Sequence, residues 1–223
     1  MASNINKATV AYDYIETKII RGEYPPLSII DEAQLIAELH TSRTPIREAI
    51  LRLKEMGFVY VYPNRNTLVS ELSLDLVNEM YAARFLNEPE MNVLACHHLD
   101  VKWLKLLKRQ FLSPEQTLEG AAQRDYYNAL DTALHEGLLH ACPNRFITKA
   151  LDIVYRHNRR LRCFVSHTVS VPEHVALLEA LLAKDATAIR QATLAHLQGS
   201  RELTLQAFAR GELSFSKPYQ IKA

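Results

Sequence analysis

The 223-residue sequence lacks the features of several specialised classes of protein. It has only three cysteines, Cys96, Cys142 and Cys163, and no Cys-x-x-Cys pair. Their odd number and wide spacing exclude a disulfide framework and indicate reduced interior thiols. No signal-peptide pattern and no apolar run of membrane-spanning length is present, so we expect a cytoplasmic protein with no membrane partner.

The sequence also lacks a strong charge of either sign. Its formal net charge is +1, and basic and acidic residues are equally numerous in the first 70 residues. A general attraction to nucleic acid is therefore excluded, and any affinity for DNA has to come from the local placement of cations. The overall composition, with 48% hydrophobic and 23% charged residues, suits one or two ordinary globular domains.

What the sequence does contain is a short, well-marked helix that ends at Gly57. Ser42 and Thr44 supply oxygens that can cap its start, and Pro45 falls in the first turn, where its missing N–H costs nothing. An apolar stripe recurs at helical spacing. The stripe consists of Ile46, Ala49, Ile50 and Leu53.

Two arginines lie near the start of this helix, on the side that the apolar stripe leaves free. Arg43 and Arg47 are one turn apart. A guanidinium group can hydrogen-bond bidentately to the O6 and N7 atoms of guanine, so this placement suits the major groove of DNA. The sequence therefore predicts a recognition helix.

Together with this helix, the segments before and after it predict a winged helix-turn-helix. Residues 31–39 predict a second amphipathic helix with Asp31 as its N-cap, and three residues join the two helices. Two β-prone runs, 58–62 and 67–70, are separated by turn residues and predict a hairpin wing. The alternative is a small helical core with incidental arginines. The agreement of caps, spacing and wing favours the winged helix.

The rest of the chain predicts helices almost throughout. A first helix is expected over residues 10–20, with a buried stripe of Val10, Tyr14, Ile15 and Ile19. The fold class is thus mainly α: a winged helix-turn-helix domain over residues 1–72, then an all-α bundle over residues 73–223. The predicted bundle helices span 74–98, 101–112, 113–141 with a possible break near Gly120, 145–167, 171–183 and 185–209.

Four residues of the bundle have spacings that suit a metal site. Asp131 and His135 are four residues apart and stack on one face of a helix. His174 and His196 lie on either side of a predicted helix connection, each about 15–16 Å from it at ~1.5 Å per residue. In an antiparallel hairpin they return to nearly the same level. Three imidazoles and a carboxylate suit Zn²⁺, Ni²⁺ or Mn²⁺. Taken singly, each histidine also fits a surface or hydrogen-bonded core position.

A cluster of arginines occupies residues 156–162. It could line a pocket for an acidic ligand. It could equally be a solvated helix face supported by Asp152, which lies one turn before Arg156. We expect the solvated face for most of the cluster.

These residues carry a family resemblance that covers essentially the whole chain. Residues 42–50, Ser-Arg-Thr-Pro-Ile-Arg-Glu-Ala-Ile, are similar to the S-R-T-P-V-R-E-A-L hallmark of the GntR-family winged helix. The second half resembles the FCD effector domain of the FadR-like subgroup. The residues that match its motifs are Arg84, Glu88-Pro89, Asp131, His135, Asn144, Glu173-His174 and His196-Leu197.

The resemblance implies a homodimeric, ligand-responsive transcriptional regulator and not an enzyme. Its partners would be a double-stranded DNA operator and a small carboxylate effector. A divalent metal ion (Zn, Ni or Mn) would be held by the four predicted ligands, with Arg84 and Asn144 in the effector site. The expected DNA contacts are Ser42, Arg43, Thr44, Arg47, Arg52, Asn64, Arg65 and Asn66.

The sequence departs from the family pattern at several positions. Leu27 and His40 stand where glycines are usual, Ala33 stands where many members have arginine, and asparagines replace the glycine of the wing. The operator sequence therefore cannot be transferred from relatives. Two other functions are compatible with the sequence. One is a metal-dependent enzyme acting on a small acid, with Glu136 or Glu173 as its nearest base, and the other is an architectural DNA binder whose bundle only dimerises.

Overall fold

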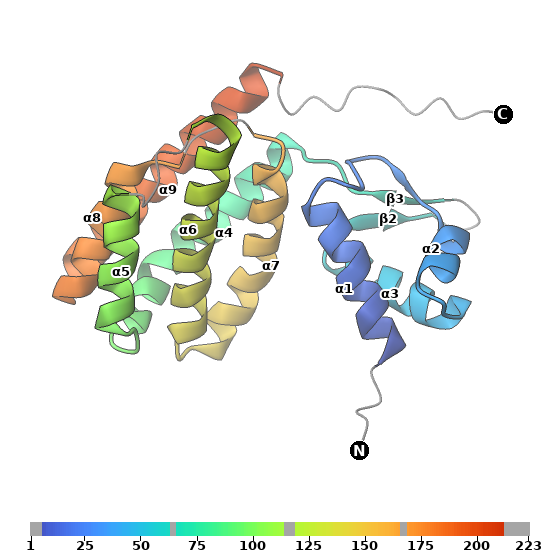
Figure 1. Cartoon of the computed structure of the whole chain (residues 1–223), viewed down its shortest axis with the longest axis horizontal. Helices are drawn as coiled ribbons and strands as arrows, with labels where there is room; N and C mark the ends of the chain where they lie inside the picture. The colour runs from blue at the N-terminus through green and yellow to red at the C-terminus, as the bar shows by residue number, and fades with distance from the viewer. Residues whose placement is uncertain (1–5, 63–65, 114–118, 166–168, 212–223) are drawn as a thin grey trace. The chain divides into compact units, whose positions relative to one another are not determined.

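The computed structural model describes residues 6–62, 66–113, 119–165 and 169–211, and the chain divides into two compact units (Figure 1). The winged-helix unit contains the chain up to Ser73 together with residues 156–165. The helical unit contains Leu74–Tyr155 and the described residues from Val169 to Arg210. Within the described ranges, no helix combines the length and apolar character needed to span a bilayer.

The winged-helix unit packs three helices against a small antiparallel sheet. Its strands lie in the order β1-β3-β2, with Tyr60 of β2 and Ile29 of β1 both paired with Leu68 of β3. The predicted fold class is confirmed, although β1 has only two residues and gave no periodic signal. The elements are α1 (Lys7–Ile20), β1 (Ile29–Ile30), α2 (Glu32–Glu38), α3 (Arg43–Glu55), β2 (Val59–Val61) and β3 (Thr67–Val69).

The starts of these helices show which cap predictions hold. Asp31 caps α2 as predicted, because its carboxylate accepts from the backbone N–H groups of Ala33 and Gln34 at 2.8 and 3.2 Å. Ser42 occupies the N-cap position of α3, but its hydroxyl makes no capping hydrogen bond. The predicted capping role of Ser42 is therefore wrong, and its exposed side chain remains available to a ligand.

The buried face of α1 differs from the predicted stripe. Ile15 and Ile19 are buried as expected, but Val10 is 43% exposed. Tyr12 is buried in place of Tyr14, and its hydroxyl donates to the Glu16 carboxylate at 2.7 Å. Helical spacing distinguishes the two tyrosines, because Tyr12 lies three residues before Ile15 and seven before Ile19 on the same face, whereas Tyr14 lies off that face.

Residues 156–165 complete the core of the winged-helix unit. His157 stacks on Phe58 with ring centroids 4.2 Å apart, and its Nε2 lies 2.8 Å from the carbonyl oxygen of Met56. Arg160 is fully buried and donates to the hydroxyl and the carbonyl oxygen of Ser70. The expected solvated face is thus wrong for Arg160, because its hydrogen-bond partner lies 90 residues away in sequence.

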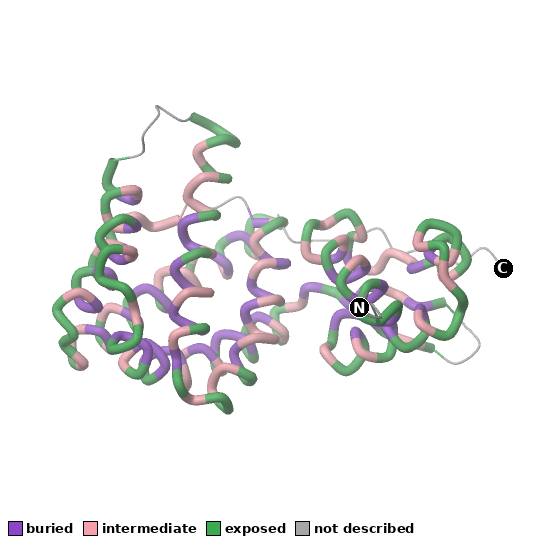
Figure 2. Tube along the Cα trace, turned by 60° about the horizontal axis from the view of Figure 1, so that its bottom comes forward, coloured by how far each residue is buried: buried purple, intermediate pink, exposed green. Residues whose placement is uncertain are grey.

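The helical unit consists of six helices among the described residues. Figure 2 shows that buried residues gather on the inward sides of these helices. All six predicted segments are found, while the predicted start at 114–116 lies outside the described residues. The helices are α4 (Leu74–Ala95), α5 (Val101–Leu112), α6 (Gly120–Ala141), α7 (Arg145–Arg162), α8 (Val171–Ala183) and α9 (Ala186–Ala209).

Candidate metal centre and nucleic-acid interface

Four buried side chains from three helices converge inside the helical unit. Asp131 and His135 come from α6, His174 from α8 and His196 from α9. Each offers one ligand atom, and these atoms all lie within 4.8 Å of one another. Two ligands bound to one ion at about 2.1 Å can be at most about 4.2 Å apart, so shifts of less than about 1 Å would close the cluster on an ion.

The helix connections explain why distant residues meet. Asp131 and His135 share a face of α6 because they are one turn apart. Between α8 and α9, Lys184 adopts a left-handed conformation with φ of 54°, and Asp185 then caps α9 by accepting from two backbone N–H groups. This tight turn makes the two legs of the hairpin equal, which brings His174 and His196 to the same level, as the spacing predicted.

The hydrogen bonds of His174 indicate a place for a cation. Its Nδ1 donates to the carbonyl oxygen of Ser170 at 2.7 Å, and its Nε2 lies 2.9 Å from Oδ1 of Asp131. A neutral imidazole that donates from Nδ1 carries a lone pair on Nε2, which faces a carboxylate oxygen here. Such an arrangement is repulsive unless a proton or a metal ion lies between the two atoms, so this donor set fits a metal.

The other two histidines complete the cluster. The Nε2 atom of His135 lies 3.7 Å from Oδ1 of Asp131, and burial lowers the pKa of His135 well below its ordinary value. A neutral imidazole is the form that binds metal ions. The ring of His196 adjoins both other imidazoles, with centroids 4.5 Å from His174 and 5.1 Å from His135, so the three rings form a triangle.

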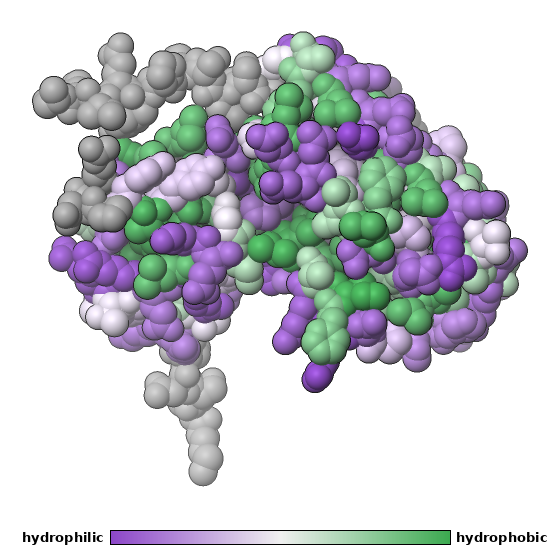
Figure 3. Space-filling view, turned by 180° about the vertical axis from the view of Figure 1, so that it is seen from behind, coloured by the Kyte–Doolittle hydropathy of each residue, from purple (hydrophilic) through white to green (hydrophobic). Residues whose placement is uncertain are grey.

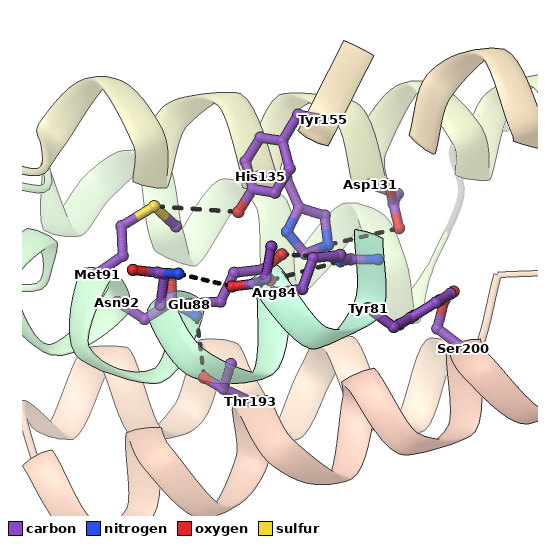
Figure 4. A network of polar contacts seen from close by, with 12 residues as sticks. Tyr81, Arg84, Glu88, Met91, Asn92, Asp131, His135, Tyr155, Thr193 and Ser200 are labelled. Carbon is purple, nitrogen blue, oxygen red and sulfur yellow. Dashed lines mark hydrogen bonds and ion pairs between the residues drawn. The ribbon is translucent and has the colours of Figure 1, made fainter. Parts of the chain in front are cut away.

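A buried ion pair on α4 adjoins this cluster. Figure 4 shows Arg84 and Glu88 gathered with His135 and Tyr155 between α4, α6 and α7. Nε of Arg84 donates to Oε1 of Glu88 at 2.5 Å, and the guanidinium is only 1% exposed. The charge of Arg84 is therefore compensated within the protein. Its Nη1 has no hydrogen-bond partner among the described residues. The effector role of Arg84 stays a prediction.

Asn144 has a structural role that its position explains. Its side-chain oxygen accepts from the backbone N–H groups of Phe146 and Ile147 at 3.1 and 3.3 Å, which caps the start of α7. His135 lies six residues before the end of α6, or about 9 Å along the helix axis. The predicted effector contact of Asn144 has no support in this geometry and stays a prediction.

The start of α3 presents the predicted DNA-contacting side chains to solvent. Ser42, Arg43, Thr44 and Arg47 are all exposed. Nε of Arg47 lies 3.3 Å from Glu32, but the arginine side chain remains 62% exposed, so this weak surface pair leaves it available to DNA.

The remaining predicted DNA contacts are Arg52 and three residues of the wing. The guanidinium of Arg52 lies 4.2 Å above the ring of Tyr12, which holds it against α1. Asn66 is exposed, whereas Asn64 and Arg65 lie outside the described residues. Two exposed tyrosines on the wing, Tyr60 and Tyr62, were not predicted as contacts. Their i, i+2 spacing places both side chains on one face of the wing.

Each half of the chain matches a known protein family. Residues 7–69 match the family model described as "Bacterial regulatory proteins, gntR family", and residues 79–199 match the FCD domain. The chain belongs to the GntR family. It is a transcriptional regulator with a DNA-binding winged helix and an FCD effector domain, and its relatives are regulators, not enzymes.

The relatives of this GntR-family protein span most of its length. It is 26% identical over 190 residues to an uncharacterized HTH-type transcriptional regulator, YdhC, of Bacillus subtilis, covering 83% of this chain and 85% of that one. It is 22% identical to the transcriptional repressor RspR of Escherichia coli, covering 87% of each. The structure of E. coli McbR/YncC shares the fold, with a TM-score of 0.73, 17% identity, and 92% of this chain and 99% of that one covered.

The positions where this GntR-family chain lacks the usual glycines keep the backbone shape that glycine favours. Leu27 has φ of 64° and His40 has φ of 45°, both in the left-handed region. A non-glycine residue in that region costs about 1–2 kcal/mol. The turns around the recognition helix are therefore retained at a cost in stability.

Proposed function

We propose that this regulator senses a small carboxylate at a divalent metal centre and changes its affinity for an operator in response. Residues 1–72 form the DNA-binding domain, and residues 73–223 form the domain for effector binding and dimerisation. The observation that carries the proposal is the buried cluster of three imidazoles and one carboxylate in the FCD domain.

Asp131, His135, His174 and His196 would hold the ion, which the ligand types restrict to Zn²⁺, Ni²⁺, Mn²⁺ or a similar metal. When bound, the ion supplies a positive charge for a small carboxylate. Because Glu88 compensates Arg84, the ion carries most of the attraction for an anion inside this domain. Effector binding then shifts the protein between states only through its different affinity for them.

The DNA half of the proposal rests on the exposed start of α3. Arg43, Thr44 and Arg47 contact bases and phosphates, with Ser42, Arg52 and the wing residues Asn64, Arg65 and Asn66 as further contacts. Since its partner is DNA, we place the protein in the cytoplasm. Repression is the expected direction, because relatives include RspR and a probable D-xylose utilization operon repressor of Paenarthrobacter nicotinovorans.

Exposed apolar side chains support a homodimer. Figure 3 shows apolar surface interrupting the hydrophilic face of the helical unit. Leu86 of α4 is 79% exposed, while Leu194 of α9, the helix packed beside α4, is 43% exposed. A second copy covering such side chains would gain hydrophobic free energy, and pairing two winged helices raises affinity for a two-part operator.

Metal analysis of the purified full-length protein tests the proposal. We expect about one bound ion per chain and its loss in a His135→Ala/His174→Ala double variant. His140→Ala removes an exposed histidine from the same helix and should keep the ion. Absence of metal from wild-type protein supplied with Zn²⁺, Ni²⁺ and Mn²⁺ contradicts the proposal. If metal is bound, a thermal-shift screen of organic and sugar acids that stabilises nothing would instead favour an architectural role.

A further inference from the structure

The carboxylate of Glu173 lies beside the cluster, although Glu173 is not one of the four predicted ligands. Glu173 directly precedes His174 on α8, and its Oε2 atom lies 3.6 Å from Nδ1 of His196 on α9. Its side chain is 29% exposed, whereas that of His196 is 5% exposed. Glu173 therefore approaches the ring of His196 from the solvent side of the cluster.

A glycine on α9 provides the space for this carboxylate. Gly199 lies one turn after His196, and a Cβ built there would be 2.4 Å from Oε1 and 3.2 Å from Oε2 of Glu173. The backbone at Gly199 is not in the left-handed region that favours glycine. Glycine is less favourable than alanine inside a helix, so its presence here needs a reason. The close approach of the Glu173 carboxylate supplies that reason, because a side chain at position 199 would collide with it.

Metal-binding histidines usually donate their second ring N–H to a carboxylate or a carbonyl oxygen, which fixes the tautomer and the orientation of the ring. His174 already has such a partner in the carbonyl oxygen of Ser170. For His196, Glu173 is the carboxylate that faces Nδ1. A movement of less than about 1 Å would bring the two atoms from 3.6 Å to hydrogen-bonding distance.

We propose that Glu173 is a positioning residue for the metal ligand His196, and that Gly199 is required to admit its carboxylate. The Nδ1–H group of His196 donates to Glu173, which directs Nε2 of the ring toward the ion. This inference rests on the proposed metal centre. It adds a hydrogen bond between Glu173 and His196 that raises the affinity for the metal, although Glu173 itself does not bind the ion.

Competition for Zn²⁺ against a chromophoric chelator, with full-length protein, tests this inference. Glu173→Ala should weaken Zn²⁺ binding by about 10- to 100-fold. Gly199→Ala should weaken it similarly, because the added methyl group displaces the carboxylate. Glu173→Gln, whose amide oxygen still accepts a hydrogen bond, should recover part of the loss. Glu179→Ala, which removes a more exposed carboxylate from the same helix, should bind Zn²⁺ like wild type.

The double variant Glu173→Ala/Gly199→Ala separates a specific contact from general damage. Without the carboxylate, the methyl group at position 199 displaces nothing, so the double variant should bind Zn²⁺ no more weakly than Glu173→Ala alone. Melting temperatures in EDTA report on the fold, and Gly199→Ala should melt at or above the wild-type temperature since alanine favours the helix.

The outcomes distinguish this inference from the proposed function. Wild-type affinity in Glu173→Ala, or losses that add fully in the double variant, overturns the role of Glu173 while leaving the metal centre intact. Failure of wild-type protein to bind Zn²⁺, Ni²⁺ or Mn²⁺ overturns both.

Discussion

The start of α3 and the buried cluster of the helical unit differ in how far folding fixes the positions of their side chains. At the start of α3, Arg43 and Arg47 are exposed, and apart from a surface pair between Arg47 and Glu32 the local helix positions them. In the cluster, the four proposed ligands are buried and meet because α6, α8 and α9 pack together. The difference indicates that folding alone organises the proposed metal ligands, whereas the proposed DNA contacts are exposed side chains whose conformations DNA binding would have to fix. Changes in the two regions should consequently have separable effects.

The largest expected effect is at Asp131, which supplies the only negative charge among the four proposed ligands. Asp131→Asn should weaken Zn²⁺ binding by at least about 100-fold, because a first carboxylate ligand matters more than the outer contacts that cost 10- to 100-fold. The measurement is chelator competition. Arg47→Ala, tested in parallel, should bind Zn²⁺ like wild type. Equal metal affinity in the wild type and Asp131→Asn would show that the ion is bound elsewhere.

A smaller effect is expected at Arg47. Arg47→Ala should weaken binding to a DNA fragment selected by the wild-type protein, by about 1–3 kcal/mol if the arginine contacts a base. Its stability to urea should stay within about 0.5 kcal/mol of wild type, since the side chain is exposed. Fluorescence anisotropy measures the affinity. Lys149→Ala removes an equal charge from the helical unit and should change affinity little; unchanged affinity in Arg47→Ala would remove the recognition-helix assignment.

The pH dependence of stability should reveal the buried His157. Burial lowers the pKa of His157 below its ordinary value of 6.5, so the unfolded chain binds a proton more readily than the folded protein. Its contribution to the free energy of unfolding is therefore full above pH 6.5 and is lost as the pH falls through 6.5 toward the folded pKa. Urea unfolding of wild type and His157→Gln at pH 7.5 and 5.5 checks this prediction.

Glutamine at position 157 can still donate to Met56 but cannot take up a proton. The variant should consequently lose less stability than wild type between the two pH values. An identical loss in both proteins would mean that His157 is not a source of the pH dependence.

The smallest expected effect is at His40, where the left-handed backbone is unfavourable for a non-glycine residue. His40→Gly should stabilise the winged-helix unit by about 1 kcal/mol. Ala37→Gly, an exposed site within α2, should have the opposite sign and destabilise it by about 1 kcal/mol. Urea unfolding of both variants provides the check. A loss of stability in His40→Gly would show that the histidine makes a favourable contact that exceeds the backbone cost.

The same contrast between local and tertiary positioning explains which features the sequence could predict. Caps such as Asp31 and Asp185, together with helical periodicity, are local, so the sequence predicts each helix. Some ends still differ, since α1 begins three residues before its predicted start and α7 ends five residues before its predicted end.

The two pairs of the proposed metal cluster were predictable separately, because one helix face positions Asp131 and His135 and one tight hairpin positions His174 and His196. That the two pairs meet depends on tertiary packing and was expected from the family resemblance. The sequence predicts a solvated position for Arg160 and no role for His157, because their partners Ser70 and Phe58 come close only through tertiary packing.

The compensation of Arg84 shows a further limit of sequence reasoning. Arg84 and Glu88 match a family motif in the sequence, but only their burial shows that they form an ion pair, which neutralises the charge expected to attract the effector. Similarly, the role proposed for Gly199 can be recognised only once the structure shows that Glu173 of the neighbouring helix lies against it. A glycine whose role is to leave room for another side chain cannot be recognised from the sequence of its own helix.

Anomalous diffraction at the zinc absorption edge, from crystals of the Zn²⁺-loaded protein, tests the central claim most directly. The account predicts one strong peak per chain, bonded to Asp131, His135, His174 and His196 at about 2.0–2.2 Å. Well-ordered crystals with no peak among these four side chains, or with the ion held by other residues, would contradict it.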